Sequence, residues 1–194
     1  MRKDTVSIIL NSARELFWKH GFRRVTVEEI CARAGISKMT FYRYFTDKIE
    51  LAKRIFENEA REGYKRFKDI ISDESILPEE KINRILLLKF EGTNDIRQEF
   101  LRDFYIVKGS GLAEHAEAIT NEIWQSVISD FREAQAKGIF RKDMNPEFFF
   151  LISRKFIEMF NDKKMVQLFP SPQEMLMEMA KLLLYGISPL KNSE

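Results

Sequence analysis

The residues 26-TVEEICARAGISKMTFYRYFTDK-48 predict two short helices joined by a tight turn. Thr26 is suited to be the N-cap of the first helix, because its hydroxyl can accept a backbone N–H of the first turn. Gly35 can adopt the left-handed conformation that ends a helix. Between them, apolar side chains have the spacing of one buried helical face: Val27, Ile30, Cys31 and Ala34. The stretch therefore predicts a helical corner with one side packed in a core.

The second helix of this corner is predicted from Lys38 to Phe45, after a cap at Ser37. At roughly 100° per residue, Phe41 and Phe45 fall on one face. The other sides carry side chains that can donate hydrogen bonds to phosphates or bases: Lys38, Thr40, Tyr42, Arg43, Tyr44 and, further on, Lys48. Helix-turn-helix domains have this order of parts, with the second helix in the major groove of DNA. A packing corner without DNA contact is the alternative interpretation.

Composition indicates a folded protein. The chain has 194 residues, of which 44% are hydrophobic, so it can bury a sizeable core. No apolar run approaches the roughly 20 residues that cross a bilayer, and the N-terminal segment does not read as a secretory signal. A single cysteine, Cys31, excludes an intrachain disulfide and fits a reducing compartment. We expect a cytoplasmic protein that does not enter a membrane.

Charge is unevenly distributed along the chain. Residues 1–50 hold ten Lys or Arg against six Asp or Glu, whereas the remaining 144 residues hold 22 against 24. The basic part therefore coincides with the predicted helix-turn-helix, which supports an interaction with nucleic acid without proving it.

Helical periodicity continues through the rest of the chain, and no stretch shows the alternation of a strand. Further helices are predicted at about residues 4–19, 48–70, 78–91, 112–137, 146–163 and 172–185, together with one that starts at Thr93 or Asn94. The expected fold is all-α, with about nine helices.

The last two predicted helices are strongly apolar. Phe148, Phe149 and Phe150 spread around most of the first, and the second is rich in Leu and Met. Broad apolar helices at the end of a soluble chain suggest a partner surface, most simply for a second copy of the chain. A deeply buried pair of core helices is the alternative.

Residues for catalysis are scarce. His20 and His115 are the only histidines, Cys31 is the only cysteine, and the sequence has no glycine-rich phosphate loop. Adjacent acidic pairs such as Glu28 and Glu29 lie at helix starts, where the helix dipole explains them. We therefore expect neither an enzyme nor a cofactor or metal site.

The N-terminal part of the chain resembles the DNA-binding domain of the TetR family of bacterial transcriptional regulators. The resemblance rests on a first helix that ends in KHGF and on the segment VTVEEICARAGISKMTFYRYFTDKIEL, and it covers about residues 4 to 60. It implies a helix-turn-helix DNA-binding domain at residues 1–50, with a bridging helix to about residue 70. Residues 51–194 would form a helical ligand-binding and dimerisation domain, for which only the arrangement of helices agrees.

The resemblance also implies a function. The chain would form a homodimer through its last two helices, bind a palindromic double-stranded DNA operator and repress nearby genes. A small apolar or amphipathic effector, bound among the later helices, would release the DNA. A transcriptional activator, or a helical ligand-binding module without effector-controlled repression, is the alternative.

Family positions that contact DNA match individual residues of this chain. Thr26 and Lys48 match phosphate contacts, and Arg43 is expected at phosphate as well. The base-reading start of the second helix matches Lys38, Met39 and Thr40, and contacts to bases or phosphate match Tyr42 and Tyr44. Met39 can offer only apolar contact, for instance to a thymine methyl group.

Three aromatic residues, Phe104, Trp124 and Phe156, are the kind that could line an effector pocket. Aromatic side chains at helical spacing are more often part of a core, which is the alternative for all three.

Overall fold

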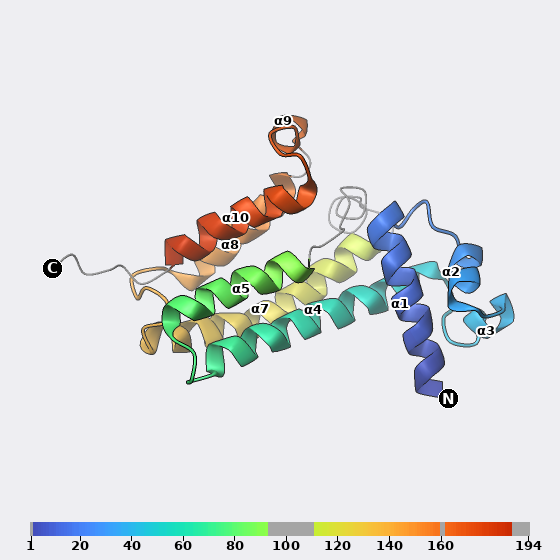
Figure 1. The fold of residues 1–194 in the computed structure, drawn as a ribbon, viewed down its shortest axis with the longest axis horizontal. Helices are drawn as coiled ribbons and strands as arrows, with labels where there is room; N and C mark the ends of the chain where they lie inside the picture. Colours follow the sequence, from blue (N-terminus) through green and yellow to red (C-terminus); the bar gives the residue numbers. More distant parts are fainter. Residues whose placement is uncertain (1, 93–110, 160–161, 188–194) are drawn as a thin grey trace. The chain divides into compact units, whose positions relative to one another are not determined.

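The computed structural model describes residues 2–92, 111–159 and 162–187, and helices are the only regular secondary structure in these ranges (Figure 1). The all-α prediction is confirmed. The helices are α1 (Arg2–His20), α2 (Val27–Ala34), α3 (Lys38–Tyr42), α4 (Lys48–Ser72), α5 (Pro78–Gly92), α7 (Leu112–Ala136), α8 (Pro146–Glu158), α9 (Lys163–Val166) and α10 (Pro172–Ile187). The helix predicted to start at Thr93 or Asn94 lies outside the described residues.

The chain divides into two compact units. The first unit takes in residues 1–59 and 95–119, and the second takes in residues 60–94 and 120–194. The helices α4 and α7 therefore each contribute residues to both units. The predicted division into a DNA-binding domain at 1–50 and a ligand-binding domain at 51–194 stays a prediction.

The core of the first unit forms where α1 packs against α2. Phe17 and Phe41 are completely buried, and the ring of Phe22 meets that of Phe17 edge-on at 5.4 Å between centroids. Phe22 and Val25, which precede α2, are both buried. They fix the direction in which the chain enters α2, and this supports the exposed surface of the corner.

The core of the second unit is formed by buried side chains of α4, α5, α7 and α10 and of the segment after α7. The helix α10 packs along α5 and also against α8 (Figure 1). Phe131 is buried at the centre of this core, with the rings of Phe140 and Phe149 at 4.5 and 5.3 Å. The buried aliphatic side chains around it include Ile71, Ile82, Ile85, Leu184 and Ile187.

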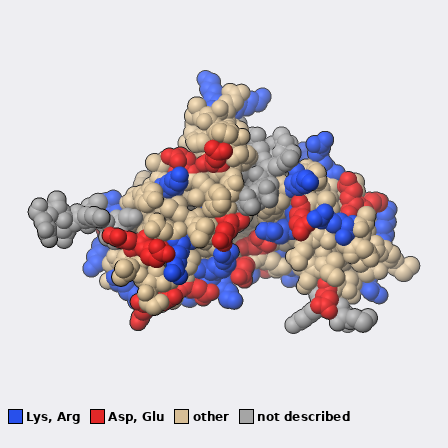
Figure 2. All heavy atoms as spheres, viewed as in Figure 1, with Lys and Arg blue, Asp and Glu red and all other residues tan. Residues whose placement is uncertain are grey.

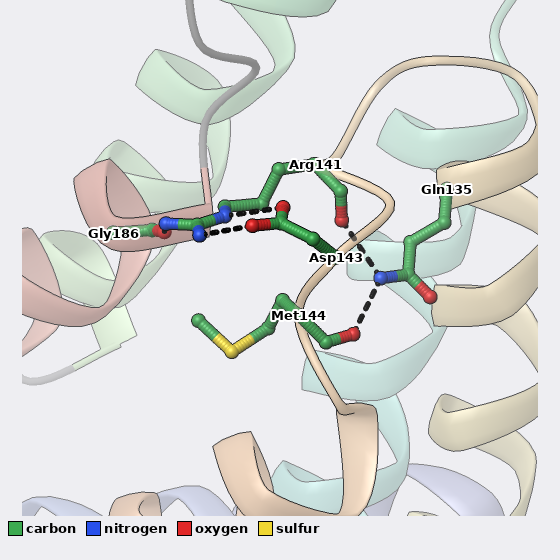
Figure 3. Close-up of polar contacts among 5 residues, drawn as sticks. All are labelled: Gln135, Arg141, Asp143, Met144 and Gly186. Carbon is green, nitrogen blue, oxygen red and sulfur yellow. Dashed lines mark hydrogen bonds and ion pairs between the residues drawn. The ribbon is translucent and has the colours of Figure 1, made fainter.

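A network of hydrogen bonds and one ion pair fixes the loop between α7 and α8 (Figure 3). The Gln135 side chain donates to the carbonyls of Arg141 and Met144, each at 2.8 Å. The Arg141 guanidinium binds Asp143 and donates to the Gly186 carbonyl at 3.2 Å, while the Arg141 backbone N–H donates to the Ile187 carbonyl at 2.9 Å. Arg141 thus caps the last carbonyls of α10.

Three differences from the predicted helix boundaries have an identifiable cause or consequence, at the ends of α3, α8 and α10. The helix α3 ends at Tyr42 instead of Phe45, because Tyr44 N–H bonds to Phe41 C=O and tightens the chain. The helix α8 ends at Glu158, and Asp162 caps the short extra helix α9. The helix α10 continues through Gly186, which the sequence suggested as its end, since Arg141 binds the carbonyls there.

Candidate nucleic-acid interface

The turn between α2 and α3 has the geometry that the sequence predicts. Gly35 adopts the left-handed conformation with φ 65°, and its N–H donates to the Ala32 carbonyl. The Ile36 N–H reaches back to the Cys31 carbonyl at 3.0 Å, which satisfies the last carbonyls of α2. Ser37 then caps α3 by accepting the Thr40 N–H at 3.1 Å. The helix α3 therefore starts at Lys38, three residues after the C-cap Gly35 of α2.

Thr26 begins α2 with a complete capping box. The Thr26 hydroxyl accepts the Glu29 N–H at 3.2 Å, and the Glu29 carboxylate accepts the Thr26 N–H at 2.7 Å. These bonds hold the pKa of the Glu29 carboxyl below its ordinary value. A second cap follows at the start of α4, where the Asp47 carboxylate accepts the Glu50 N–H at 2.7 Å.

The helix α3 separates a core face from an exposed face. Phe41 and Phe45 are buried with their rings 5.9 Å apart, as predicted. On the other side, Met39 is 84% exposed and Tyr42 is 55% exposed. The Lys38 and Arg43 side chains are exposed as well, whereas Thr40 and Tyr44 are half-buried. All of the side chains predicted to contact DNA between Lys38 and Tyr44 therefore keep at least part of their surface accessible.

Two of the exposed cations on the corner have partners that the sequence did not suggest. Lys38 forms an ion pair with Glu28 of α2, which lowers the pKa of the Glu28 carboxyl and raises that of the Lys38 ammonium. The Arg43 guanidinium lies over the Tyr44 ring, 5.2 Å from its centroid. Glu28 and Lys38 are ten residues apart, so only the geometry of the turn brings them together.

Lys48 lies in the first turn of α4 and binds the segment that precedes α2. Its ammonium donates to the carbonyls of Phe22 at 2.8 Å, Val25 at 2.6 Å and Arg23 at 3.5 Å. It also lies over the Phe22 ring, 4.4 Å from the centroid. Lys48 thus ties the turn before Thr26 to the start of α4, a role that sequence comparison with phosphate-binding positions did not reveal.

The surface charge is mixed. On the face drawn in Figure 2, Lys and Arg side chains are interspersed with Asp and Glu side chains. On this face the two signs of charge alternate, and no broad basic field is seen.

Two of the three predicted pocket residues lie in the described part of the second unit. Trp124 is half-buried on α7, and the centroid of its ring lies 3.7 Å from the ring centroid of the buried Phe150. The Trp124 indole N–H is buried and has no hydrogen-bond partner among the described residues. Phe156 is half-buried on α8, and Phe104 lies outside the described residues.

The described residues contain neither a cluster of metal-binding side chains nor a membrane-spanning helix. Among them, no three His, Cys, Asp or Glu side chains are grouped in a way that could hold a metal ion. None of the described helices is both long and apolar enough to span a bilayer.

The helix-turn-helix corner and its exposed recognition helix define the class of a DNA-binding regulator. Residues 9–55 match the model of the bacterial regulatory proteins of the tetR family. These residues carry the DNA-binding domain of the TetR family, as the sequence motif predicted, and this is a family of transcriptional regulators and not of enzymes.

Two curated transcriptional regulators are similar to this chain in sequence. The chain is 28% identical to the HTH-type transcriptional regulator UidR of Escherichia coli K12 over 146 residues, which is 74% of this chain and 72% of UidR. It is 30% identical to the dhaKLM operon transcriptional activator DhaS of Lactococcus lactis over 98 residues, 50% of this chain and 49% of DhaS.

Two regulators called FadR share the fold. FadR from Bacillus halodurans, a fatty acid degradation regulator, has a TM-score of 0.68 with 17% identity and covers 94% of this chain and 95% of its own. FadR from Bacillus subtilis, solved in complex with stearoyl-CoA, has a TM-score of 0.63 with 18% identity and covers 93% and 98%.

Proposed function

We propose that this TetR-family regulator is a homodimeric repressor that binds a palindromic operator and is released by a small apolar or amphipathic effector. The observation that carries the proposal is the exposed face of α3, on which Lys38, Met39 and Tyr42 are accessible while Phe41 is buried. Such a helix can enter a major groove without unfolding its own core.

The DNA contacts follow from the two helices of the corner. Lys38, Met39 and Thr40 would read bases at the start of α3. Phosphate or base contacts would come from Thr26, Tyr42, Arg43, Tyr44 and Lys48. For Lys48, a phosphate contact would have to be shared with the backbone carbonyls that its ammonium already binds.

Dimerisation is supported by large apolar side chains that the single chain leaves exposed. Phe148 and Leu151 on α8, and Leu182 and Tyr185 on α10, are between 57% and 65% exposed. Each pair has i, i+3 spacing, so it forms a stripe on one side of its helix. A second copy of α8 and α10 would cover these side chains. If α8 and α10 were a buried core pair within one chain, the four side chains would not be exposed.

An apolar or amphipathic effector is supported by the aromatic cluster of the second unit. Trp124 and Phe150 provide ring surface, and the Trp124 indole N–H is a buried donor that a ligand oxygen could satisfy. FadR from Bacillus subtilis, which shares the fold, was solved with stearoyl-CoA, an amphipathic compound.

A gel-shift experiment tests the proposal. The full chain is incubated with fragments from the region upstream of its own gene, with excess unrelated duplex as competitor. We expect one fragment to be retained, and stearoyl-CoA or another long-chain acyl compound to release it. Retention of no fragment would contradict operator binding.

Activation is the second possibility, because DhaS is a transcriptional activator. A reporter gene behind the retained fragment separates the two functions. Expression should rise when the regulator gene is deleted, whereas a fall would identify an activator.

A further inference from the structure

Glu28 differs from the other carboxylates of the helix-turn-helix corner in what it faces. Its neighbour Glu29 is used in the capping box with Thr26, and Glu15 pairs with Arg33. Glu28 instead reaches from the first turn of α2 to Lys38, the first residue of α3. The side chains of Lys38 and Glu28 are 54% and 59% exposed, so the pair lies on the surface of the corner and not in its core.

We propose that Glu28 is a positioning residue for base recognition, because it holds the Lys38 ammonium at the start of the recognition helix. This inference rests on the proposed base-reading role of Lys38. An ammonium group has three N–H donors, so a bond to Glu28 leaves two for a base edge. A lysine that is already held in one direction loses less side-chain freedom when it binds that base.

The effect depends on the sequence of the DNA. Repulsion between the Glu28 carboxylate and the phosphates acts on operator and unrelated DNA alike. The held Lys38 ammonium, in contrast, adds affinity only where the DNA offers it a suitable acceptor. The pair raises the ratio of the two affinities, which is the quantity that defines specificity.

Fluorescence anisotropy with the full chain can test this. The probes are a labelled duplex carrying the preferred sequence of the wild-type protein and all of its single-base-pair variants. We expect Glu28→Gln to reduce the preference at one base pair of each half-site by about twofold to fivefold, in the range of an exposed ion pair. Lys38→Gln should reduce the preference at the same base pair, and the double variant should show no larger reduction than Lys38→Gln alone.

Glu91→Gln is the matched control, because Glu91 is an exposed carboxylate that pairs with Arg66 in the second unit. It removes the same charge and should leave every preference unchanged. Thermal melting of each variant verifies that the corner remains folded.

Three results would overturn the inference. These are an unchanged preference profile in Glu28→Gln, a reduction spread evenly over all positions, or a reduction that persists in the Lys38→Gln background. If the wild-type chain prefers no sequence at all, the proposed function fails, and the inference fails with it. The two failures are therefore distinguishable.

Discussion

At the scale of single residues, the corner combines side chains that the sequence could assign with contacts that it could not. Phe41 and Phe45 were predicted as core from their spacing, and both are buried. The carbonyl contacts of Lys48 and the pairing of Glu28 with Lys38 depend on how the turns bring distant residues together. Periodicity describes one helix at a time, so it cannot predict such contacts.

The Tyr42 hydroxyl is predicted to contribute to DNA binding on every sequence. Tyr42→Phe removes the hydroxyl and keeps the ring, which packs edge-on against Phe41 at 5.3 Å. Affinity for operator and for shuffled duplex should fall by similar factors, about threefold to tenfold for one hydrogen bond. Equal affinities of the Tyr42 variant and the wild type would show that the Tyr42 hydroxyl makes no contact with DNA.

Lys48 is predicted to affect both stability and DNA binding. Lys48→Met deletes the donors to the Phe22 and Val25 carbonyls, and urea unfolding should show the free energy of unfolding fall by about 1–3 kcal/mol. The slope of log affinity against log salt should also become shallower by about 0.9 for each phosphate that the variant no longer neutralises. An unchanged slope would mean that Lys48 only supports the turn.

At the scale of elements, most helices follow from apolar periodicity and caps, whereas several ends do not. The sequence predicts the last helix to about residue 185, yet α10 runs to Ile187, where Arg141, 45 residues before Gly186, binds the Gly186 carbonyl. The early end of α3 likewise depends on the inward turn that packs Phe45 against Phe41. Tertiary contacts decide these boundaries, and a local pattern does not contain them.

The capping box of α2 should make stability depend on pH in a defined direction. The pKa of Glu29 is lowered in the folded chain, so its contribution is present above the unfolded pKa and disappears as pH falls through the folded pKa. The difference in melting temperature between wild type and Glu29→Gln should therefore be full at pH 7 and shrink below about pH 4. A difference that stays constant down to pH 3 would contradict the role of the box.

Lys81 is predicted to hold the end of α4. Its buried ammonium donates to the carbonyls of Ile71 at 2.5 Å and Asp73 at 2.7 Å, and burial lowers its pKa. Lys81→Ala would leave these carbonyls unsatisfied and should destabilise the chain by about 1–3 kcal/mol in urea unfolding. Lys137→Ala removes an exposed lysine that pairs with Glu133, and it should cost far less.

At the scale of the whole molecule, the proposal requires two copies of the corner on one DNA. The exposed stripes on α8 and α10 are the predicted contact between the copies. Leu151→Arg combined with Leu182→Arg should give a monomer in sedimentation analysis, because two charged side chains cannot be buried against a second copy. Leu168→Arg, at a side chain that is also highly exposed but lies beyond α9, should leave the dimer intact. A dimer that survives the double substitution would place the interface elsewhere.

Selection of wild-type protein on a library of random DNA duplexes tests the central claim most directly. We predict enrichment of a palindrome whose half-sites lie about 10 base pairs apart or somewhat more, bound by two copies of the chain. Enrichment of no sequence, or of a single half-site bound by one copy, would contradict it.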